Sequence, residues 1–437
     1  MKKSRGDLEQ ININAAGIDI GSEFHYVAVP EDRAEQSIRK FACYTTDLKE
    51  MAHWLSECGI ETVAMESTGV YWIPVFQILE QNGFDVILVN ARYIKNVPGR
   101  KSDVVDCRWI QQLHTYGLLH GSFYPESIIR KLRTYLRQRD NLIKSRGSHI
   151  QRMQKSMIQM NIQLHKVISD ISGETGMRIM RSIIKGERDP VKLAQMKDWR
   201  IRSSVDVIAK SLEGNYQEEQ LFCLRQEIEQ YDYICGKIAE CEEKIEQTLN
   251  EIEDKDKDND TDIDNKDDGR DIREKLESIC EVDLTQIDGL DVNTVETIIS
   301  EVGIDMNKWP TEKHFGSWLG LSPNHKISGG KILSSKSKKV VNRASTAFRL
   351  AAFGVSNSKK SSMGAFYRRL RSRIGAPKAI TATAYKIARI FYKCMKYKIE
   401  YKDLGADYYE RMYKERVLRN FKQKAAQLGF SLVPLQV

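Results

Sequence analysis

The spacing of the apolar residues changes near residue 125, and this change limits the folds that the chain can adopt. Residues 15–125 hold short apolar runs between turn residues, such as AAGIDIG at 15–21 and DVILV at 85–89. Such runs are typical of buried strands. Residues 127–250 instead repeat apolar side chains every three or four positions, which is typical of helices. The sequence therefore predicts an α/β domain followed by an all-α region.

The α/β domain is expected to span residues 1–126. The first three strands are joined by short connections and are predicted to pair antiparallel, whereas the later strands alternate with helices. The second helix ends at Gly83, a residue suited to a helix C-terminus. This order predicts a mixed sheet with helices packed on it. The expected strands are 15–21, 25–30, 37–44, 61–66 and 85–89, and the expected helices are 46–58 and 71–82.

Residues 127–250 are predicted to form a helical coiled-coil region. Heptad spacing predicts either a coiled coil within one chain or one between two chains. We assign this region the role of a spacer or dimerisation arm. The first stripe consists of Ile150, Met153, Met157, Met160 and Leu164, and the second of Leu221, Leu224, Ile228, Tyr231, Cys235, Ile238, Ile245 and Leu249.

Three further segments follow the helical region. Residues 251–275 are charged and nearly free of apolar side chains, which predicts a disordered acidic linker. Residues 276–400 are expected to form a basic, mostly helical domain. Residues 401–437 are expected to form a helical tail, whose Tyr408, Tyr409 and Tyr413 have no predicted chemical role.

The net charge of +8 is modest, but the charges are distributed unevenly. From Lys313 to Ile399 there is no Asp or Glu, while Lys and Arg occur 20 times. An acidic tract from Glu251 to Asp271 lies upstream. Such a separation is typical of a surface that binds a polyanion. The alternative is a solvated basic face on an ordinary enzyme.

Several protein classes are disfavoured by the composition. No apolar run approaches the roughly 20 residues that cross a bilayer, and no apolar segment of the signal-peptide type follows the basic start. The 8 cysteines include no CxxC pair, which argues against a zinc ribbon or a disulfide framework. We therefore expect a protein that stays in the reducing compartment where it is made, the cytoplasm.

Two carboxylates are predicted at the ends of buried strands. Asp19 ends the first strand and is followed by a glycine–serine turn, and Glu66 ends the strand 61–66 before another small-residue turn. A charge in such a position is expected to face a cleft rather than a core. Taken alone, Asp19 also fits the phosphate loop of an actin-like ATPase.

Two more carboxylates are predicted at the start of a helix. Asp103 and Asp106 lie one turn apart, after Ser102 as a predicted N-cap, and therefore on one helical face. Taken alone, this pair is also what a solvated helix N-terminus favours. Together with the two strand-end acids, the pair can converge on hard cations, and two Mg²⁺ ions are the expected cofactors.

Residues 284–303 have the form of a helix–hairpin–helix, in which a glycine turn offers backbone N–H groups to a phosphate. The usual second glycine is Asp291 in this chain. The motif therefore has two interpretations, phosphate binding and simple packing.

A serine followed by two glycines marks the basic domain. Ser328 precedes Gly329 and Gly330 and is flanked by Lys326 and Lys331. Glycines let the backbone approach DNA, and the two cations can hold a phosphate beside the hydroxyl. Such a serine can attack phosphorus. The alternative is a Ser/Gly loop that only binds the DNA backbone, a role that also suits the nearby Ser334, Ser335 and Ser337.

Other residues are predicted to contact nucleic acid. Phe366 and Tyr367 lie among arginines, which suggests base stacking next to phosphate contacts. The predicted phosphate-binding residues are Arg100, Lys101, Lys326, Gly329, Gly330, Lys331, Lys336, Lys338, Lys339, Arg343, Arg368, Arg369, Arg371 and Arg373.

The motifs GIDIGS, MESTGVYW and GRKSDVVDCRW resemble the three blocks of the DEDD insertion-sequence transposases. The later segments FGSWLGLSPNHKISGGK and GAFYRRLRSRIGAPKAITATAYKIARIFYK resemble the C-terminal blocks of that family. The resemblance covers residues 15–125 and 276–400. It implies an N-terminal domain similar to ribonuclease H and Holliday-junction resolvases, in which Asp19, Glu66, Asp103 and Asp106 hold Mg²⁺. It also implies that Ser328 is the nucleophile.

The resemblance further implies that the chain recombines a circular element with target DNA, guided by a structured bridging RNA from the element's own noncoding end. The expected partners are DNA, this guide RNA, and copies of the chain in a dimer or tetramer whose two domains form a composite site. One alternative is a metal-dependent junction nuclease that forms no covalent intermediate. Another is a dimeric nucleic-acid-binding protein without catalytic activity.

Overall fold

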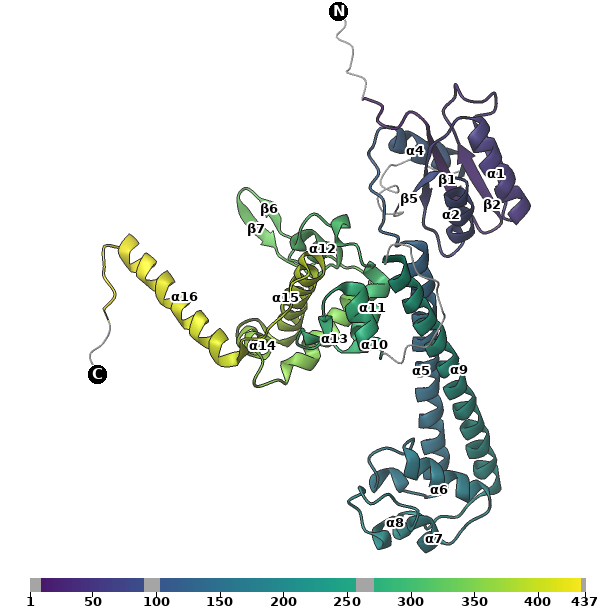
Figure 1. Ribbon diagram of the computed structural model, residues 1–437, viewed down its shortest axis with the longest axis vertical. Coiled ribbons are helices and arrows are strands. Elements are labelled where there is room, and N and C mark those ends of the chain that lie inside the picture. Colours follow the sequence, from purple (N-terminus) through teal and green to yellow (C-terminus); the bar gives the residue numbers. More distant parts are fainter. Residues whose placement is uncertain (1–8, 90–102, 257–270, 434–437) are drawn as a thin grey trace, which may run out of the picture. The chain divides into compact units, whose positions relative to one another are not determined.

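The computed structural model describes residues 9–89, 103–256 and 271–433 (Figure 1). The chain divides into two compact units, residues 1–124 and residues 125–437, which are described separately below. Arg100 and Lys101 lie outside the described residues. Within the described ranges, no helix is long and apolar enough to cross a membrane.

The first unit is built on one five-stranded sheet with the strand order β3-β2-β1-β4-β5. Its strands are β1 (Ala15–Ile20), β2 (Phe24–Ala28), β3 (Ile38–Ala42), β4 (Thr62–Glu66) and β5 (Asp85–Val89). The first three strands pair antiparallel, and β4 and β5 continue the sheet parallel to β1. This mixed sheet is of the ribonuclease-H type and confirms the predicted fold class of the domain.

Helices cover both faces of this sheet (Figure 1). Alternate residues of β1, including Ile18 and Ile20, share an apolar core with α1 (Thr45–Glu57) and α2 (Trp72–Gln81). The intervening residues face α4 (Asp103–Thr115) on the other side. The two faces of the central strand therefore pack against two different helical layers.

Gly17 allows α4 to lie very close to β1. A Cβ atom at this position would lie 2.2 Å from the backbone nitrogen of Gln111 and 2.5 Å from the carbonyl oxygen of Cys107. The C-terminal end of α4 is held at the opposite end of the sheet, where His114 Nε2 lies 2.8 Å from Thr62 Oγ1. Helix α4 thus runs antiparallel to β1, and its N-terminus lies at the carboxyl ends of β1 and β4.

In the second unit, α5 (Ser127–Gln159) and α9 (Glu218–Asp256) lie side by side and antiparallel (Figure 1). Lys131 pairs with Glu251 at 2.7 Å, and His149 contacts Glu227 at 2.5 Å. Between them the chain forms α6 (Glu174–Ile184), α7 (Pro190–Ala194) and α8 (Val205–Ser211), after a turn of 3-10 helix at Leu164–Lys166. We call α5, α9 and the intervening helices the arm.

The arm has its own apolar core, and its two long helices carry opposite charge. Much of both predicted apolar stripes is buried, including Met153, Met157 and Leu224. Helix α5 contains nine basic residues and one acidic residue, whereas α9 contains thirteen acidic residues and four basic ones.

The predicted boundaries of the acidic linker are wrong at both ends. Helix α9 continues to Asp256, because Ile252 and Glu253 are buried and Glu253 accepts a hydrogen bond from Ser278 at 2.7 Å. Helix α10 (Ile272–Cys280) starts directly after Asp271, whose side chain caps it. Residues 257–270, the rest of the predicted linker, lie outside the described residues.

The remaining chain forms the C-terminal domain, which is mostly helical as predicted. An aromatic core of Phe315, Phe348, Phe391 and Tyr392 holds its central helices together. Its helices are α11 (Val292–Val302), α12 (Glu312–Trp318), α13 (Arg343–Ser356), α14 (Ser362–Ile374), α15 (Ala376–Tyr397) and α16 (Gly405–Gln427), with 3-10 turns at Leu284–Gln286 and Met306–Lys308. A two-stranded hairpin, β6 (Lys326–Ser328) and β7 (Lys331–Ser334), is inserted between α12 and α13.

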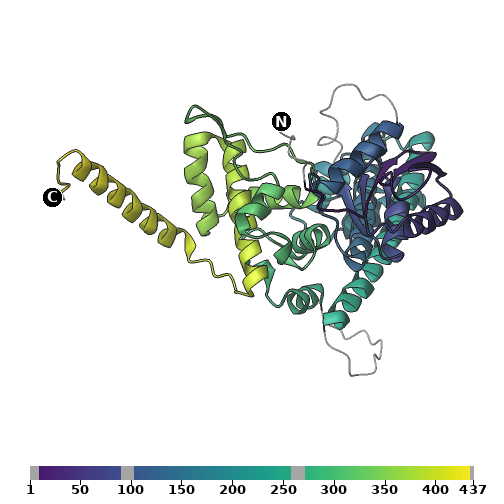
Figure 2. The ribbon, with the colours of Figure 1, turned by 90° about the horizontal axis from the view of Figure 1, so that it is seen from above.

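Helix α16 contains no buried residue and leads away from α14 and α15 (Figure 2). Its first turns are fastened to α14. The guanidinium of Arg369 lies 3.2 Å from the ring centre of Tyr413, and the ring of Tyr409 packs edge-on against Phe366. Two of the three tail tyrosines thus have a structural role that the sequence did not indicate.

Candidate functional site

Asp19 and Glu66 lie next to each other at the carboxyl ends of neighbouring parallel strands. Ile18 of β1 is in register with Met65 of β4, so Asp19 and Glu66 occupy the next pair of positions. Side chains at matching positions of paired strands point to the same face of a sheet. Both carboxylates therefore face the α4 side, and Glu66 Oε1 accepts a hydrogen bond from Thr68 Oγ1 at 3.2 Å.

Helix α4 brings Asp106 to the same end of the unit. Asp106 directly precedes Cys107, which is fully buried and whose carbonyl lies against Gly17 of β1. Burial raises the pKa of the Cys107 thiol to about 12, and the negative charge of Asp19 acts in the same direction. Asp19 therefore lies close to this turn of α4. Asp103 begins the helix one turn earlier, but its side chain lies outside the described residues.

The donor types at this end of the unit suit a hard cation. Carboxylate oxygens are the ligands preferred by Mg²⁺, and the raised pKa of Cys107 disfavours the thiolate form that softer metals need. Among the side chains that the structure describes, no group of three or more His, Cys, Asp and Glu is arranged to hold a metal. Asp19 and Glu66 thus lie side by side at one edge of the sheet, Asp106 is on the helix that covers that face, and a complete cage is not found among the described side chains.

Ser328 lies in the exposed β6–β7 hairpin. It pairs across the hairpin with Lys331, and the two residues between them form the turn. Gly329 and Gly330 have φ values of +54° and +76°, as a two-residue hairpin turn with two left-handed residues requires. No atom lies within 4 Å of the position that a Cβ would take on either glycine. The sequence predicted a loop here, although two apolar–polar alternations around Gly-Gly were a usable hairpin signal.

The glycine turn at residue 289 packs against α13. A Cβ on Gly289 would lie 2.5 Å from Val355 Cγ2 and 2.6 Å from the carbonyl oxygen of Ala351. Asp291 caps α11 by accepting a hydrogen bond from the backbone N–H of Thr294 at 2.8 Å. Of the two interpretations of the helix–hairpin–helix motif, these contacts favour packing.

Apart from Arg100 and Lys101, which lie outside the described residues, the predicted phosphate-binding cations fall into two groups. Three of them make contacts within the chain. Arg343 pairs with Asp140 at 3.2 Å, Arg368 donates to the carbonyl oxygens of residues 358 and 359, and Arg369 pairs with Glu410. The others are exposed side chains on the hairpin, the segment that follows it, and the end of α14: Lys326, Lys331, Lys336, Lys338, Lys339, Arg371 and Arg373.

The expected base stacking at Phe366 and Tyr367 is wrong. Tyr367 is buried in the C-terminal domain. Phe366 packs against Tyr409 of α16, and the ammonium group of Lys386 lies 4.5 Å from its ring centre. Both rings take part in packing within the chain because α14 lies between α15 and α16, a contact that the local sequence does not reveal.

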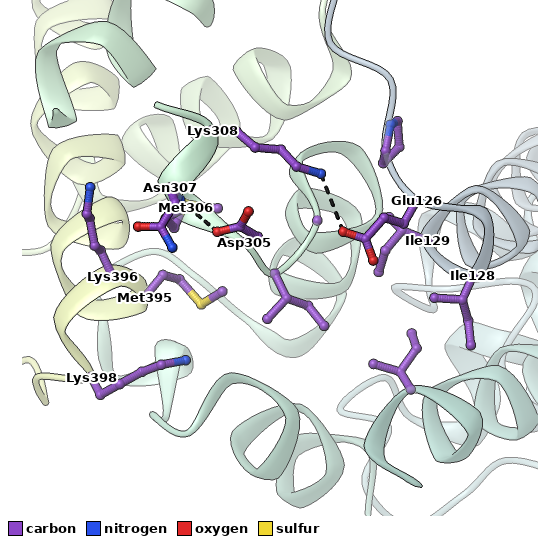
Figure 3. Close-up of a pocket in the computed structure, with 14 residues that line it drawn as sticks. Glu126, Ile128, Ile129, Asp305, Met306, Asn307, Lys308, Met395, Lys396 and Lys398 are labelled. Atoms are coloured by element: carbon purple, nitrogen blue, oxygen red, sulfur yellow. Dashed lines mark hydrogen bonds and ion pairs between the residues drawn. The ribbon is translucent and has the colours of Figure 1, made fainter. Parts of the chain in front are cut away.

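A cavity of about 350 Å³ lies apart from these residues, between the start of α5, the α11–α12 connection and the end of α15 (Figure 3). Lys308 Nζ lies 3.5 Å from Glu126 Oε1 at its rim, and Met395 and Lys396 line its other side. None of the predicted site residues lines this cavity. We assign it no function.

Two family models match the chain. Residues 16–162 match the IS110 DEDD model, described as a transposase. Residues 283–368 match a model described as the transposase family IS116/IS110/IS902. The first match contains all four predicted acids, and the second contains Ser328. No curated protein matches the chain.

Proposed function

The chain belongs to the IS110-type transposase family, and on this premise we propose that it cuts and rejoins DNA through a covalent bond to Ser328. As the bond between Ser328 Oγ and the DNA phosphorus forms, one P–O bond of the strand breaks. The departing oxygen takes up a proton and becomes a hydroxyl end, and the serine hydroxyl gives up a proton. Rejoining reverses these steps with a different hydroxyl end.

The observation that carries this proposal is the pairing of Ser328 with Lys331 on an exposed hairpin. Because the two residues are a cross-strand pair, their side chains share one face. The ammonium group is thus available to hold a phosphate beside the hydroxyl. The absence of Asp and Glu from Lys313 to Ile399 removes charges that would repel the DNA there.

Asp19, Glu66, Asp103 and Asp106 are proposed to hold the metal. The family suggests dependence on a divalent cation, and we propose Mg²⁺, with two ions per site. Bound there, Mg²⁺ would neutralise charge on the phosphodiester and favour the attacking oxygen. Asp19 and Glu66 follow matching positions of two parallel strands on the face that α4 covers, and this supports the proposal.

We further propose that a structured guide RNA from the same element selects the DNA sites. Exposed lysines suit contacts to nucleic-acid backbones rather than readout of base edges. The arm is proposed to act as a coiled coil that builds a dimer or tetramer, in which the acids and the serine form a composite site. Its place of action would be the nucleoid in the cytoplasm of a prokaryotic host.

The decisive experiment traps the covalent bond. The full chain is incubated with RNA transcribed from the flanking noncoding DNA, Mg²⁺ and a nicked suicide DNA of the element junction, and adducts are resolved under denaturing conditions. We expect an adduct with the unchanged chain and with Ser335→Ala, and none with Ser328→Ala or Asp106→Asn. Cleavage without an adduct would identify a metal-dependent junction nuclease. DNA binding without cleavage, unaffected by EDTA, would identify a non-catalytic binding protein.

A further inference from the structure

The β6–β7 hairpin has an apolar face that no other part of the described chain covers. Ile327 and Ile332 are directly opposite each other in the two strands. Their exposed fractions are 63% and 61%, and that of the neighbouring Leu333 is 70%. Burying a large aliphatic side chain is worth roughly 1.5–3 kcal/mol, so three such side chains on a hairpin tip are a strong reason to expect a binding surface.

The two faces of the hairpin differ in chemistry. Side chains alternate between faces along a strand, so the Ile327–Ile332 pair lies opposite the face that holds Ser328 and Lys331. The register shifts between Lys326 and Ile327, and Lys326 pairs with Ser334. Leu333 is therefore the extra residue of a bulge, a feature that increases the local twist of a hairpin.

The surroundings of the apolar face indicate what binds it. Every lysine of the hairpin and of the segment after it is exposed, and no acidic residue lies between Lys313 and Ile399. Binding to an apolar surface of a second protein chain would not require these surrounding lysines, whereas a polyanion is attracted by them. The five lysines are Lys326, Lys331, Lys336, Lys338 and Lys339.

A twisted two-stranded ribbon fits into a groove of duplex DNA. Apolar side chains of groove-binding proteins enter between stacked bases, unstack them and kink the duplex. The isoleucine pair stands in the position such a wedge needs, one residue pair away from Ser328 and Lys331. A glycine turn with nothing around it leaves the tip free to enter the groove.

We propose that the β6–β7 hairpin is a DNA wedge, in which Ile327 and Ile332 part a base step while the opposite face, with Ser328 and Lys331, lies along the phosphate backbone. The wedge would bend and unwind the duplex at the phosphate that the serine attacks. This inference rests on the proposed function for DNA as the substrate, but it does not require a covalent bond.

The test measures unwinding of closed circular DNA. A plasmid that carries the element is relaxed by a topoisomerase in the presence of the full chain with Ser328→Ala, which excludes cleavage, and its linking number is read after the protein is removed. DNA retention on filters gives the amount bound. We expect the linking number to fall in proportion to bound protein. Adding Ile327→Ser and Ile332→Ser should reduce the linking-number change per bound protein about fivefold or more, because short polar side chains do not insert between stacked bases.

Two controls separate the faces of the hairpin. Leu350→Ser removes an equally exposed apolar side chain from α13 and should leave the linking-number change intact. Lys331→Gln should weaken binding and lower the slope of affinity against salt by about one charge, with the change per bound protein preserved. The covalent-adduct assay is independent, so a missing adduct with normal unwinding contradicts only the serine chemistry.

Three results would overturn the wedge. One is an unchanged linking number with the starting protein bound, and another is an unchanged effect after the two isoleucines are replaced. The third is a lower assembly mass of the Ile327→Ser, Ile332→Ser variant by light scattering without DNA, which would assign the apolar face to a second copy of the chain.

Discussion

Two charged side chains meet where the arm joins the C-terminal domain, and both are almost fully buried. Arg139 of α5 lies 2.7 Å from Glu296 of α11, with exposed fractions of 7% and 1%. Burial raises the pKa of Glu296, and Arg139 acts in the opposite direction. The Nε atom of Arg139 and the Oε1 atom of Glu296 are buried without another partner. The pair therefore fixes the position of the two helices more than it adds stability.

Glu296→Gln is expected to lower the free energy of unfolding of the second unit by about 3 kcal/mol, because it leaves a buried guanidinium uncompensated. The measurement is urea denaturation followed by circular dichroism. Lys131→Gln, which breaks the exposed pair with Glu251, is the matched control and should cost less than about 1 kcal/mol. Equal losses in the two variants would contradict this account, and Arg139→Met with Glu296→Leu should recover most of the loss.

At the scale of elements, α4 is positioned by contacts at both of its ends. Near its N-terminus the absence of a side chain on Gly17 sets its distance from β1. Near its C-terminus Thr62 Oγ1 donates to the carbonyl of Asp85, so it accepts from the Nε2–H of a neutral His114. The position of Asp106 relative to Asp19 and Glu66 depends on both contacts.

Gly17→Ala is expected to displace α4 and to destabilise the first unit by about 1–3 kcal/mol, because its Cβ meets backbone atoms that cannot rotate away. It should also weaken Mn²⁺ binding, which is measured by electron paramagnetic resonance as the decrease of the free Mn²⁺ signal when protein is added. Gly147→Ala in α5 is the control, because nothing lies within 4 Å of that Cβ. It should stabilise its helix by about 0.5–1 kcal/mol. Unchanged metal binding in a folded Gly17→Ala chain would show that the close approach does not position the acids.

His114 should make the first unit sensitive to acid. Burial lowers its pKa below the ordinary 6.5 in the folded state, so the unfolded chain binds the proton more readily. Stability is then highest above about pH 6.5 and falls as the pH drops below that value. His114→Gln should reduce the difference between melting temperatures at pH 7.5 and pH 5.5. His53→Gln, at an exposed position on α1, should not change that difference. If the unchanged chain, His114→Gln and His53→Gln all show the same difference in melting temperature, His114 is not the source of the acid sensitivity.

For the whole molecule, the arm and the C-terminal domain belong to one compact unit, and the sheet domain forms the other. Calorimetry of the full chain should therefore show two unfolding transitions, of which Glu296→Gln lowers only one. A fragment of residues 125–437, which contains Glu296, should keep that same transition at nearly its original temperature. A single transition for the full chain, or an unfolded fragment, would show that the two units depend on each other.

The sequence was most informative where burial is local. The strand ends of the sheet domain were predicted to within one residue, because each apolar run is bounded by turn residues. The exceptions are the C-terminal ends of 25–30 and 37–44, which were placed two residues too late. The neighbouring positions of Asp19 and Glu66 follow from two parallel strands that end together.

The features that were missed depend on long-range contacts or on weak local signals. Arg139 and Glu296 are 157 positions apart, and no local pattern links them. The β6–β7 hairpin buries none of its side chains, so it lacks the half-buried alternation that usually identifies strands. The acidic linker was drawn too long because charged residues at the end of α9 hide the buried Ile252 and Glu253.

The unequal charges of α5 and α9 give the arm an electrical polarity across its width rather than along its length. A negatively charged rod approaching it meets attraction from one flank and repulsion from the other. The exposed charges are therefore expected to favour approach of a nucleic acid along the α5 flank over approach along the α9 flank. Raising the salt concentration would remove this preference for one flank well before it unfolds the helices, because screening weakens the interactions of exposed charges more than buried apolar contacts.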